Sequence, residues 1–417
     1  MNLGNRIDLL REVRAAGGRV AIAPLAQRQA FLKALQRELQ AGESTLLAAN
    51  REDFLQAQAA GADDARLDRL RLDSNRLAGL CQAVAEIAAQ PDPLAHTEEM
   101  GVRPSGIRLK RVRSPLGLIG MIYEARPNVT IDAAALAVFA GNAIVLRPGR
   151  EIARSAAALG ALLGAALREA DLPESAVMVV EDPDRAWFEA MLNAAGVIDL
   201  LIPRGGASLI RAVEEKARVP VLAHALGVCH TYVDGTVDLA EALPVVLNAK
   251  VQRPGVCNAT EGLLIDRAAL DRLLKPLVDA LSSAGVTLHG SSELAARDPR
   301  ILPDGDQHCG HEWLSLDLTL QAVDGVAGAI AYIARHGSGH TEAILTRDEM
   351  AAARFVQEVQ ASAVMVNAST RFNDGGELGL GAEIGISTTR LHAWGPMGAL
   401  ALTTQRWVVE GAFSVRR

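Results

Sequence analysis

Aromatic residues and long apolar runs are both scarce in this sequence. Phe, Trp and Tyr make up 3% of a chain that is 49% hydrophobic, so its core is built from Ala, Leu, Val and Ile. No charge-free apolar run reaches the roughly 20 residues that a bilayer-spanning helix needs, and residues 1–6 lack the apolar segment of a signal peptide. We therefore expect a cytoplasmic globular protein with no membrane partner.

Cysteine and net positive charge are also lacking. The cysteines Cys81, Cys229, Cys257 and Cys309 are spread over 417 residues and form no disulfide framework, which indicates reduced thiols. A net charge of -7 argues against nucleic acid as a partner, although local basic clusters can still bind phosphate.

The 417 residues are too many for one core and predict two or three domains. Helical spacing of leucines fills the region up to about residue 95. Residues 107–112 and 116–122 then have the texture of strands, and strands alternate with helices from there on, with a second alternating region after Cys257. Repeats of this kind predict right-handed crossovers and parallel sheets.

Two basic loops follow predicted strands, at residues 147–150 and 203–206. Ligands of parallel sheets bind beyond the carboxyl ends of the strands. Arginines in both loops, and Gly205-Gly206 ahead of a helix, suit a phosphate. Basic loops that are merely solvated are the competing interpretation.

Cys257 lies on a Pro-Gly turn directly before the apolar run 262–265. Such a position suits a thiolate nucleophile on a loop that a buried strand supports. A cysteine is more often a small buried hydrophobe, and the residues alone leave both interpretations open.

Several motifs together resemble one family, the γ-glutamyl phosphate reductases (glutamate-5-semialdehyde dehydrogenases) of the aldehyde dehydrogenase superfamily. The strongest is His336-Gly337-Ser338-Gly339-His340-Thr341-Glu342, and the resemblance extends over nearly the whole chain through residues 123–130, 227–234, 250–261 and 366–385. It implies an aldehyde-dehydrogenase-like α/β fold of two domains with mostly parallel sheets and a β-hairpin oligomerisation arm. The implied ranges are 1–104 and 127–225 for an NADP-binding domain, 226–390 for a catalytic domain, and 105–126 and 391–417 for the arm.

The same resemblance implies NADPH-dependent reduction of L-glutamate 5-phosphate to L-glutamate 5-semialdehyde through a thioester on Cys257, the second step of proline synthesis. Aldehyde dehydrogenases carry a glutamate about 30 residues before the cysteine that activates water; here His224 is nearest that place and residues 221–227 contain no acid. A reductase must exclude that water, so the missing acid is expected. His224 is either a phosphate contact or a packed histidine.

NAD-using relatives place a lysine and, three residues on, a ribose-binding glutamate where this chain has Arg147 and Arg150. Arginines there favour the 2′-phosphate of NADP. Further implied cofactor contacts are Arg204, Gly205 and Gly206, with Glu312 as the residue that holds the nicotinamide ribose.

The substrate residues that the resemblance implies are Asn367, Ser369 and Arg371, with Arg371 either an anchor for the α-carboxylate or a member of a structural ion pair. Either Arg126 or Asn128 supplies the oxyanion site. Cys229 is the rival nucleophile, but it precedes an apparently buried strand and is assigned to packing.

The stretch His308-Cys309-Gly310-His311 has metal-binding residue types but no obvious fourth ligand nearby, and we expect no metal. Partners are expected to be the small-molecule substrate and further copies of the chain in a homodimer or homotetramer, while association with glutamate 5-kinase stays open. The alternatives to the reductase are an oxidative aldehyde dehydrogenase of another substrate and a non-catalytic scaffold paralogue.

Overall fold

The computed structural model describes residues 3–182, 184–222 and 226–416, and these form two compact units. Unit 1 comprises Met1–Ala223, Gly379–Gly385 and Leu391–Arg417, and unit 2 comprises His224–Leu378 and Ile386–Arg390. Among the described residues, no helix is both long and apolar enough to cross a membrane.

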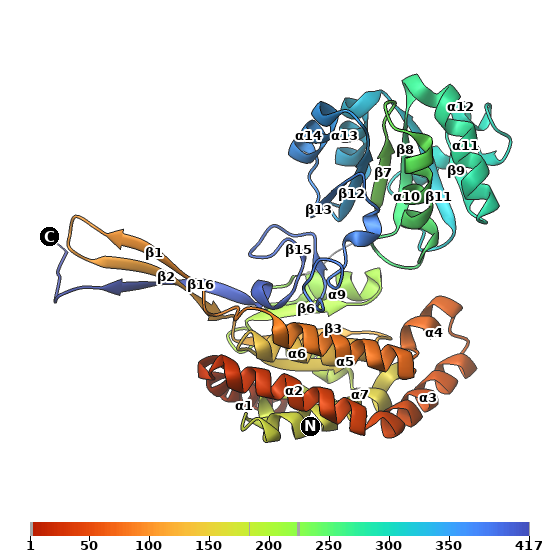
Figure 1. The fold of residues 1–417 in the computed structure, drawn as a ribbon. Coiled ribbons are helices and arrows are strands. Elements are labelled where there is room, and N and C mark those ends of the chain that lie inside the picture. The colour runs from red at the N-terminus through yellow and green to blue at the C-terminus, as the bar shows by residue number, and fades with distance from the viewer. Residues whose placement is uncertain (1–2, 183, 223–225, 417) are drawn as a thin grey trace. The chain divides into compact units, whose positions relative to one another are not determined.

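Unit 1 contains a four-stranded parallel sheet in the order β5-β4-β3-β6 (Figure 1). Its strands are β3 (Leu118–Tyr123), β4 (Ala143–Pro148), β5 (Val177–Val179) and β6 (Leu200–Arg204). All six residues of β3 are buried, as the continuous apolar run predicts. The chain leaves β3 toward β4 and returns to its other side as β6, so β3 and β6 flank the point where the strand order reverses, which is where sheets of this kind bind ligands.

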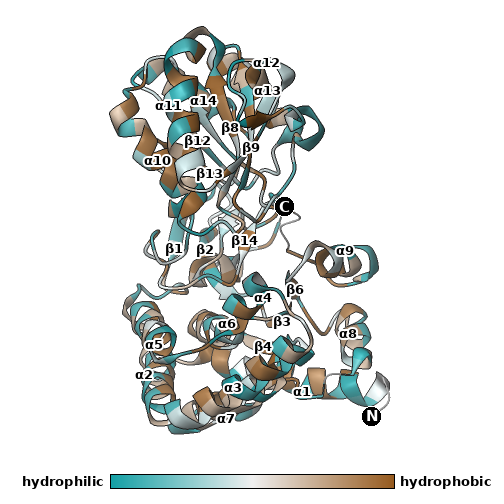
Figure 2. Cartoon of the chain, turned by 90° about the vertical axis from the view of Figure 1, so that its right-hand side faces the viewer, coloured by the Kyte–Doolittle hydropathy of each residue, from teal (hydrophilic) through white to brown (hydrophobic). Residues whose placement is uncertain are grey.

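Helices surround this sheet, and Figure 2 shows their striped hydropathy. Asp63 and Asp73 accept hydrogen bonds from backbone amides and so cap α4 and α5. The helices are α1 (Leu3–Ile22), α2 (Leu25–Ala41), α3 (Glu43–Ala59), α4 (Asp64–Leu70), α5 (Ser74–Ala89), α6 (Pro127–Phe139), α7 (Ala153–Glu169), α8 (Arg185–Leu192) and α9 (Ala207–Lys216), with short 3-10 turns η1 (Arg150–Ile152), η2 (Glu174–Ala176) and η6 (Ala399–Leu402).

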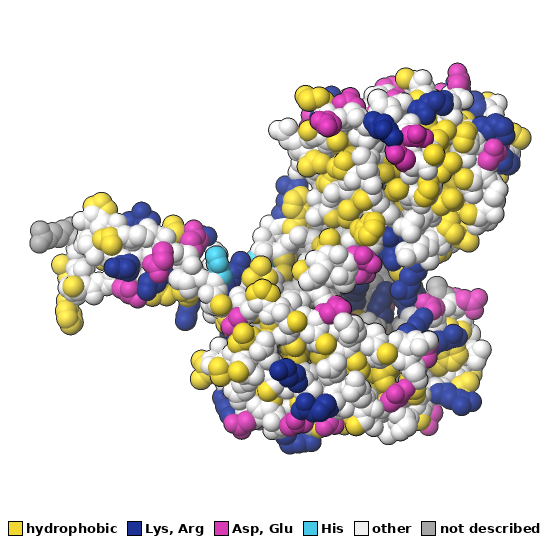
Figure 3. Space-filling view, in the orientation of Figure 1, with side chains coloured by type: hydrophobic (Ala, Val, Ile, Leu, Met, Phe, Trp, Pro, Cys, Tyr) yellow, Lys and Arg dark blue, Asp and Glu magenta, His cyan; other side chains and the backbone are white. Residues whose placement is uncertain are grey.

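A separate antiparallel sheet of unit 1 joins β1 (Thr97–Val102), β2 (Arg108–Pro115) and β16 (Thr403–Glu410). It extends away from the helices of unit 1 in Figure 1, and Figure 3 shows apolar and charged side chains mixed on its surface. The range 105–126 expected for the arm is therefore divided: β2 lies in this sheet, whereas the wholly apolar β3 pairs inside the parallel sheet.

Unit 2 is built on a seven-stranded sheet in the order β10-β9-β11-β8-β7-β12-β13, in which every pairing is parallel. Its strands are β7 (Cys229–Val233), β8 (Thr260–Asp266), β9 (Thr287–Gly290), β10 (Ile301–Leu302), β11 (Asp317–Val323), β12 (Thr341–Leu345) and β13 (Ala363–Val366), and its helices are α10 (Leu239–Val251), α11 (Leu270–Ser283), α12 (Ser292–Ala295), α13 (Gly325–His336) and α14 (Glu349–Glu358), with the 3-10 turns η3 (Arg267–Ala269), η4 (Gly305–His308) and η5 (Thr370–Phe372). Two further short strands among the described residues are β14 (Ile386–Ser387) and β15 (Gly395–Pro396).

A buried ion pair brackets the loop that carries Cys257. Lys250, near the end of α10, contacts Glu261 of β8 through Nζ and Oε2 at 2.5 Å, and both side chains are 0% exposed. The other oxygen of Glu261 accepts a hydrogen bond from the backbone amide of Leu314 at 3.1 Å. Burial raises the pKa of Glu261 to about 7 and lowers the pKa of Lys250, so each charge depends on the other to persist.

We expect Lys250→Met to lower the free energy of unfolding by about 3–5 kcal/mol, because it leaves Glu261 buried without its cation. Urea denaturation measures this. Adding Glu261→Gln, which keeps an acceptor for Leu314, should recover most of the loss. The matched control is Lys275→Met, which removes the exposed pair between Lys275 and Asp279 and should change stability by under about 1 kcal/mol. Equal effects of the two lysine substitutions would contradict the assignment.

Candidate active site

The backbone segments at residues 227 and 257 approach each other closely, and this contact fixes the position of Cys257. A Cβ atom on residue 227 would lie 2.3 Å from the carbonyl oxygen of Cys257 and 2.6 Å from its Cα, so only glycine fits at that position. The amide of Gly227 in turn donates to Oε1 of Glu312 at 2.8 Å. One glycine therefore joins the expected nucleophile to the residue expected to hold the nicotinamide ribose.

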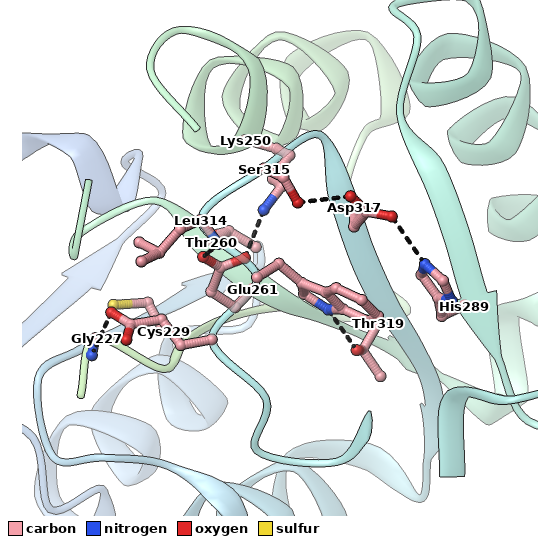
Figure 4. Close-up of polar contacts among 12 residues, drawn as sticks. Gly227, Cys229, Lys250, Thr260, Glu261, His289, Leu314, Ser315, Asp317 and Thr319 are labelled. Atoms are coloured by element: carbon pink, nitrogen blue, oxygen red, sulfur yellow. Dashed lines mark hydrogen bonds and ion pairs between the residues drawn. The ribbon is translucent and has the colours of Figure 1, made fainter. Parts of the chain in front are cut away.

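Polar contacts hold the loop that bears Glu312, and Figure 4 shows the contact partners Gly227, Glu261 and Thr319. Burial raises the pKa of its carboxyl, and the hydrogen bond from Gly227 acts in the opposite direction. The next residue, Trp313, donates from Nε1 to the hydroxyl of Thr319 at 3.0 Å, and Leu314 is held by Glu261. The carboxyl is thus presented by a loop with little freedom to move.

Cys229 differs from Cys257 in its surroundings. Its thiol is wholly buried in β7 and lies 3.1 Å from the carbonyl oxygen of Cys257. Burial raises its pKa well above the ordinary value for a thiol, with Glu342 and Cys257 adding to the effect. Cys257 itself is partly exposed. Because the thiolate is the reactive form, the structure supports Cys257 over Cys229 as the nucleophile.

Arg371 contacts both ends of the Cys257 loop. Its Nε donates to Gln252 at 2.9 Å and its Nη1 to the side-chain oxygen of Asn258. Burial lowers the pKa of the guanidinium, and the charges of Asp374 and Cys257 raise it. The sequence left two roles open for Arg371, an anchor for the α-carboxylate and a member of a structural ion pair. The contacts seen here are to amide side chains that hold the loop, and both roles stay predictions. Its positive charge near Cys257 also favours a thiolate.

Asn367 and Ser369 shape the turn ahead of Arg371. Asn367 has a left-handed backbone with φ of 54°, and its Oδ1 accepts from the amide of Thr346 at 2.8 Å. The hydroxyl of Ser369, which is 4% exposed, accepts from the amide of Arg371 at 3.2 Å. Their oxygens therefore fix the backbone, whereas a direct substrate contact stays a prediction.

The two oxyanion candidates lie at the start of α6. Arg126 occupies the N-cap position and is partly buried, whereas Asn128 is exposed and donates to Asp132 at 2.9 Å. Burial raises the pKa of Asp132 to about 7, while Asn128 and Arg204 act against that shift. The side-chain amide of Asn128 therefore donates to the carboxyl of Asp132, and a pKa of about 7 means that this carboxyl gains or loses its charge near neutral pH.

The first basic loop, residues 147–150, overlaps the end of β4, which includes Arg147. Arg147 lies 5.7 Å above the ring of Phe188, and burial and the charge of Arg150 both lower its pKa. Arg150 is exposed and opens η1. It borders an open hollow of about 550 Å³ that is lined by Gln56, Arg150, Ala153, Arg154, Ala157 and Glu181. The hollow therefore offers two guanidinium groups.

The second loop holds a carboxylate of the chain itself. The amide of Gly206, the N-cap of α9, donates to Oε2 of Glu124 at 3.1 Å, and a Cβ on residue 205 would lie 2.4 Å from the same oxygen. Arg204 pairs with Glu383 at 3.7 Å. An anion is stabilised at this helix terminus, as the glycines predict, but in the structure it is Glu124.

The remaining site residue, His224, falls in 223–225, outside the described residues. The sequence did not assign Glu124, Gly227, Lys250 or Glu261 to the site. Each belongs to a motif that carries the family resemblance, and that membership was the available signal. Lys250 and Glu261 are 11 residues apart, whereas Glu124 and Gly227 contact residues 82 and 85 positions further along the chain.

The comparisons with known proteins agree on one family. The sequence model described as "Aldehyde dehydrogenase family" matches residues 10–293. The γ-glutamyl phosphate reductase of Anaeromyxobacter sp. (strain K) is 50% identical over 97% of this chain and 95% of its own length. That of Nitratidesulfovibrio vulgaris (strain Hildenborough) is 47% identical over 100% of both chains.

A solved structure extends this similarity to the fold. The crystal structure of γ-glutamyl phosphate reductase from Thermotoga maritima superposes with a TM-score of 0.94 at 38% identity and covers 100% of both chains. The prediction of an aldehyde-dehydrogenase-like α/β fold is confirmed. The chain belongs to the γ-glutamyl phosphate reductase (glutamate-5-semialdehyde dehydrogenase) family of the aldehyde dehydrogenase superfamily.

Proposed function

We propose that this protein reduces L-glutamate 5-phosphate to L-glutamate 5-semialdehyde with NADPH, as the second step of proline biosynthesis, through a thioester on Cys257. The observation that carries the proposal is the arrangement of Cys257, Gly227 and Glu312, in which one glycine packs against the backbone of the nucleophile and donates to a partly buried carboxylate. Family membership supplies the substrate class.

The chemistry begins at the Sγ atom of Cys257. The thiolate attacks the acyl carbon, the bond from that carbon to the phosphate oxygen breaks, and phosphate leaves with the electron pair. The thioester carbon would then be reduced by hydride, which is the chemistry that bound NADPH would supply, with Arg150 and Glu312 as residues that would hold the cofactor. The resulting thiohemiacetal collapses, the carbon–sulfur bond breaks, and the aldehyde is released as the thiolate re-forms. Each step balances without a further oxidant or reductant.

The protein's own groups serve these steps in distinct ways. Arg371 holds the Cys257 loop and places a positive charge near the thiolate. Either Arg126 or Asn128 stabilises the oxyanion on the acyl carbon. Residues 221–227 contain no acid, so the chain has no carboxylate there to activate water against the thioester.

We assign NADP to unit 1. Arg150 borders a hollow that Arg154 also lines. Arg150 is exposed and occupies the position where the family resemblance implies a 2′-phosphate contact, so we assign that phosphate to its guanidinium. At the second loop, Glu124 already occupies the amide of Gly206, so a cofactor phosphate binds there only if this carboxylate moves aside.

We also infer that the sheet β1-β2-β16 contacts another copy of the chain in a homodimer or homotetramer. Val102, Trp407 and Val409 on its strands are 62%, 55% and 57% exposed. Apolar side chains this exposed are typical of a surface that a partner covers.

Phosphate dependence tests the function. With the semialdehyde and NADP, we expect reduction of NADP to require inorganic phosphate, because only phosphate releases the acyl group. Cys257→Ala should lower turnover by at least about 10³-fold, while Cys229→Ala keeps most of it. Turnover that is independent of phosphate would instead support an oxidative aldehyde dehydrogenase, and absence of turnover in the native protein would support a non-catalytic scaffold.

Cofactor choice tests the role of Arg150. We expect Arg150→Glu to shift the ratio of kcat/KM for NADPH over NADH toward NADH by about 10²-fold, because a carboxylate repels a 2′-phosphate and binds a ribose hydroxyl. Arg19→Glu, at an exposed position of α1, makes the same charge change as a control. An unchanged ratio in Arg150→Glu rejects the assignment.

The close approach at Gly227 predicts a catalytic defect without unfolding. Gly227→Ala must displace the Cys257 backbone, and a displacement of about 1 Å at the reacting group costs on the order of 10²-fold in kcat. Gly79→Ala is the control, since a Cβ at that helical position has no neighbour within 4 Å. Steady-state kinetics and the thermal midpoint are measured for both, and a Gly227→Ala enzyme with native kcat would show that the contact is dispensable.

A further inference from the structure

The proposed reaction makes no use of the histidines at positions 308 and 311. The fold brings His308, at the end of η4, to His289 of β9 and to Asp304. One ligand atom from each of His289, Asp304 and His308 lies within 4.8 Å of the others. The sequence showed no further ligand next to His308. The structure supplies two, His289 from strand β9 and Asp304 from the position before η4.

The distances within this group suit a small divalent cation. Nδ1 of His289 lies 3.0 Å from Oδ1 of Asp304, and Nε2 of His308 lies 3.5 Å from Oδ2 of the same carboxylate. Ligand atoms around a tetrahedral zinc ion, with bonds of about 2.0–2.1 Å, stand roughly 3.3 Å apart. The group is therefore close to a zinc-binding geometry.

A second carboxylate orients the ring of His289. Its Nε2 lies 3.0 Å from Oδ1 of Asp317, whose other oxygen accepts from the hydroxyl of Ser315 at 2.5 Å (Figure 4). Metal-binding histidines characteristically donate their second ring nitrogen to a carboxylate, which leaves the first nitrogen free to coordinate. Trp313 stacks on His289 with ring centroids 4.2 Å apart and so restricts rotation of the ring.

Hydrogen bonds between His289 and the two carboxylates explain only part of this arrangement. They account for Asp304 and Asp317 on either side of the ring, but they give no reason for His308 to approach the second oxygen of Asp304. The side chains of His308 and Asp304 are 30% and 36% exposed, whereas that of His289 is 9% exposed. The group is thus open to solvent on one side, where an ion can enter.

We propose that His289, Asp304 and His308 form a binding site for Zn²⁺ or a similar divalent cation of the first transition row, with water as a further ligand. Two imidazoles and one carboxylate suit such ions, whereas Mg²⁺ and Ca²⁺ prefer oxygen ligands alone. A bound ion would link His289 of β9 to Asp304 and His308, which lie at the two ends of η4. The loop that bears Glu312 begins just after this last ligand.

Calorimetric titration of the full-length Cys257→Ala/Cys309→Ser protein with zinc chloride tests the proposal, since this background removes both partly exposed thiols as competing ligands. We expect one equivalent of Zn²⁺ to bind, and Mg²⁺ not to bind at the same concentration. His308→Gln and Asp304→Asn, which alter partly exposed side chains, should each weaken binding by at least about 10-fold. The matched control is His311→Gln on the same loop, which should bind as tightly as the parent.

Absorption of a Co²⁺-loaded sample gives a second readout, because a four-coordinate nitrogen and oxygen site produces visible bands that His308→Gln should abolish. The proposal is overturned if no equivalent of Zn²⁺ binds, or if His308→Gln and Asp304→Asn bind as the parent does. It is equally overturned if His311→Gln weakens binding as much as they do, since the ligands would then be others.

Discussion

The ion pair between Lys250 and Glu261 is the constraint on which the catalytic loop depends. The side chains of Lys250 and Glu261 are wholly buried, one before and one after Cys257 in the sequence. Neither charge is stable in this position without the other. Glu261 also holds Leu314, and the loop of Leu314 presents Glu312 to Gly227. Gly227 packs in turn against the backbone of Cys257, so one buried pair supports both the proposed nucleophile and the carboxylate expected to contact the cofactor.

This arrangement also separates the two cysteines of the site. Burial makes the thiol of Cys229 a poor acid, while Cys257 keeps solvent access and has Arg371 nearby. The same chain lacks an acid at residues 221–227, near the place where the family resemblance led us to expect the water-activating glutamate of an oxidative aldehyde dehydrogenase. The combination suits an enzyme whose thioester reacts with hydride or with phosphate and is protected from hydrolysis by water.

Much of the fold was predictable because its signals are local. The apolar run of β3 and the alternation of strands and helices predicted parallel sheets, and the motifs predicted the family. The site was less predictable, because it depends on partners distant in the chain. Glycines at 205 and 206 predicted an anion but not that it is Glu124, and the His308 stretch gave no sign of His289. Asn367 and Ser369 show the same limit, since a motif does not reveal which backbone amide a side chain will hold.

If Cys257 forms a thioester that water does not cleave, a pre-steady-state measurement detects that thioester most directly. When the protein is mixed with NADP and the semialdehyde in the absence of phosphate, NADPH should appear as a burst of one equivalent per chain and then stop. Peptide mass analysis should then find a glutamyl adduct on Cys257, which added phosphate removes. A steady rate without a burst, or an adduct on another residue, would contradict the account.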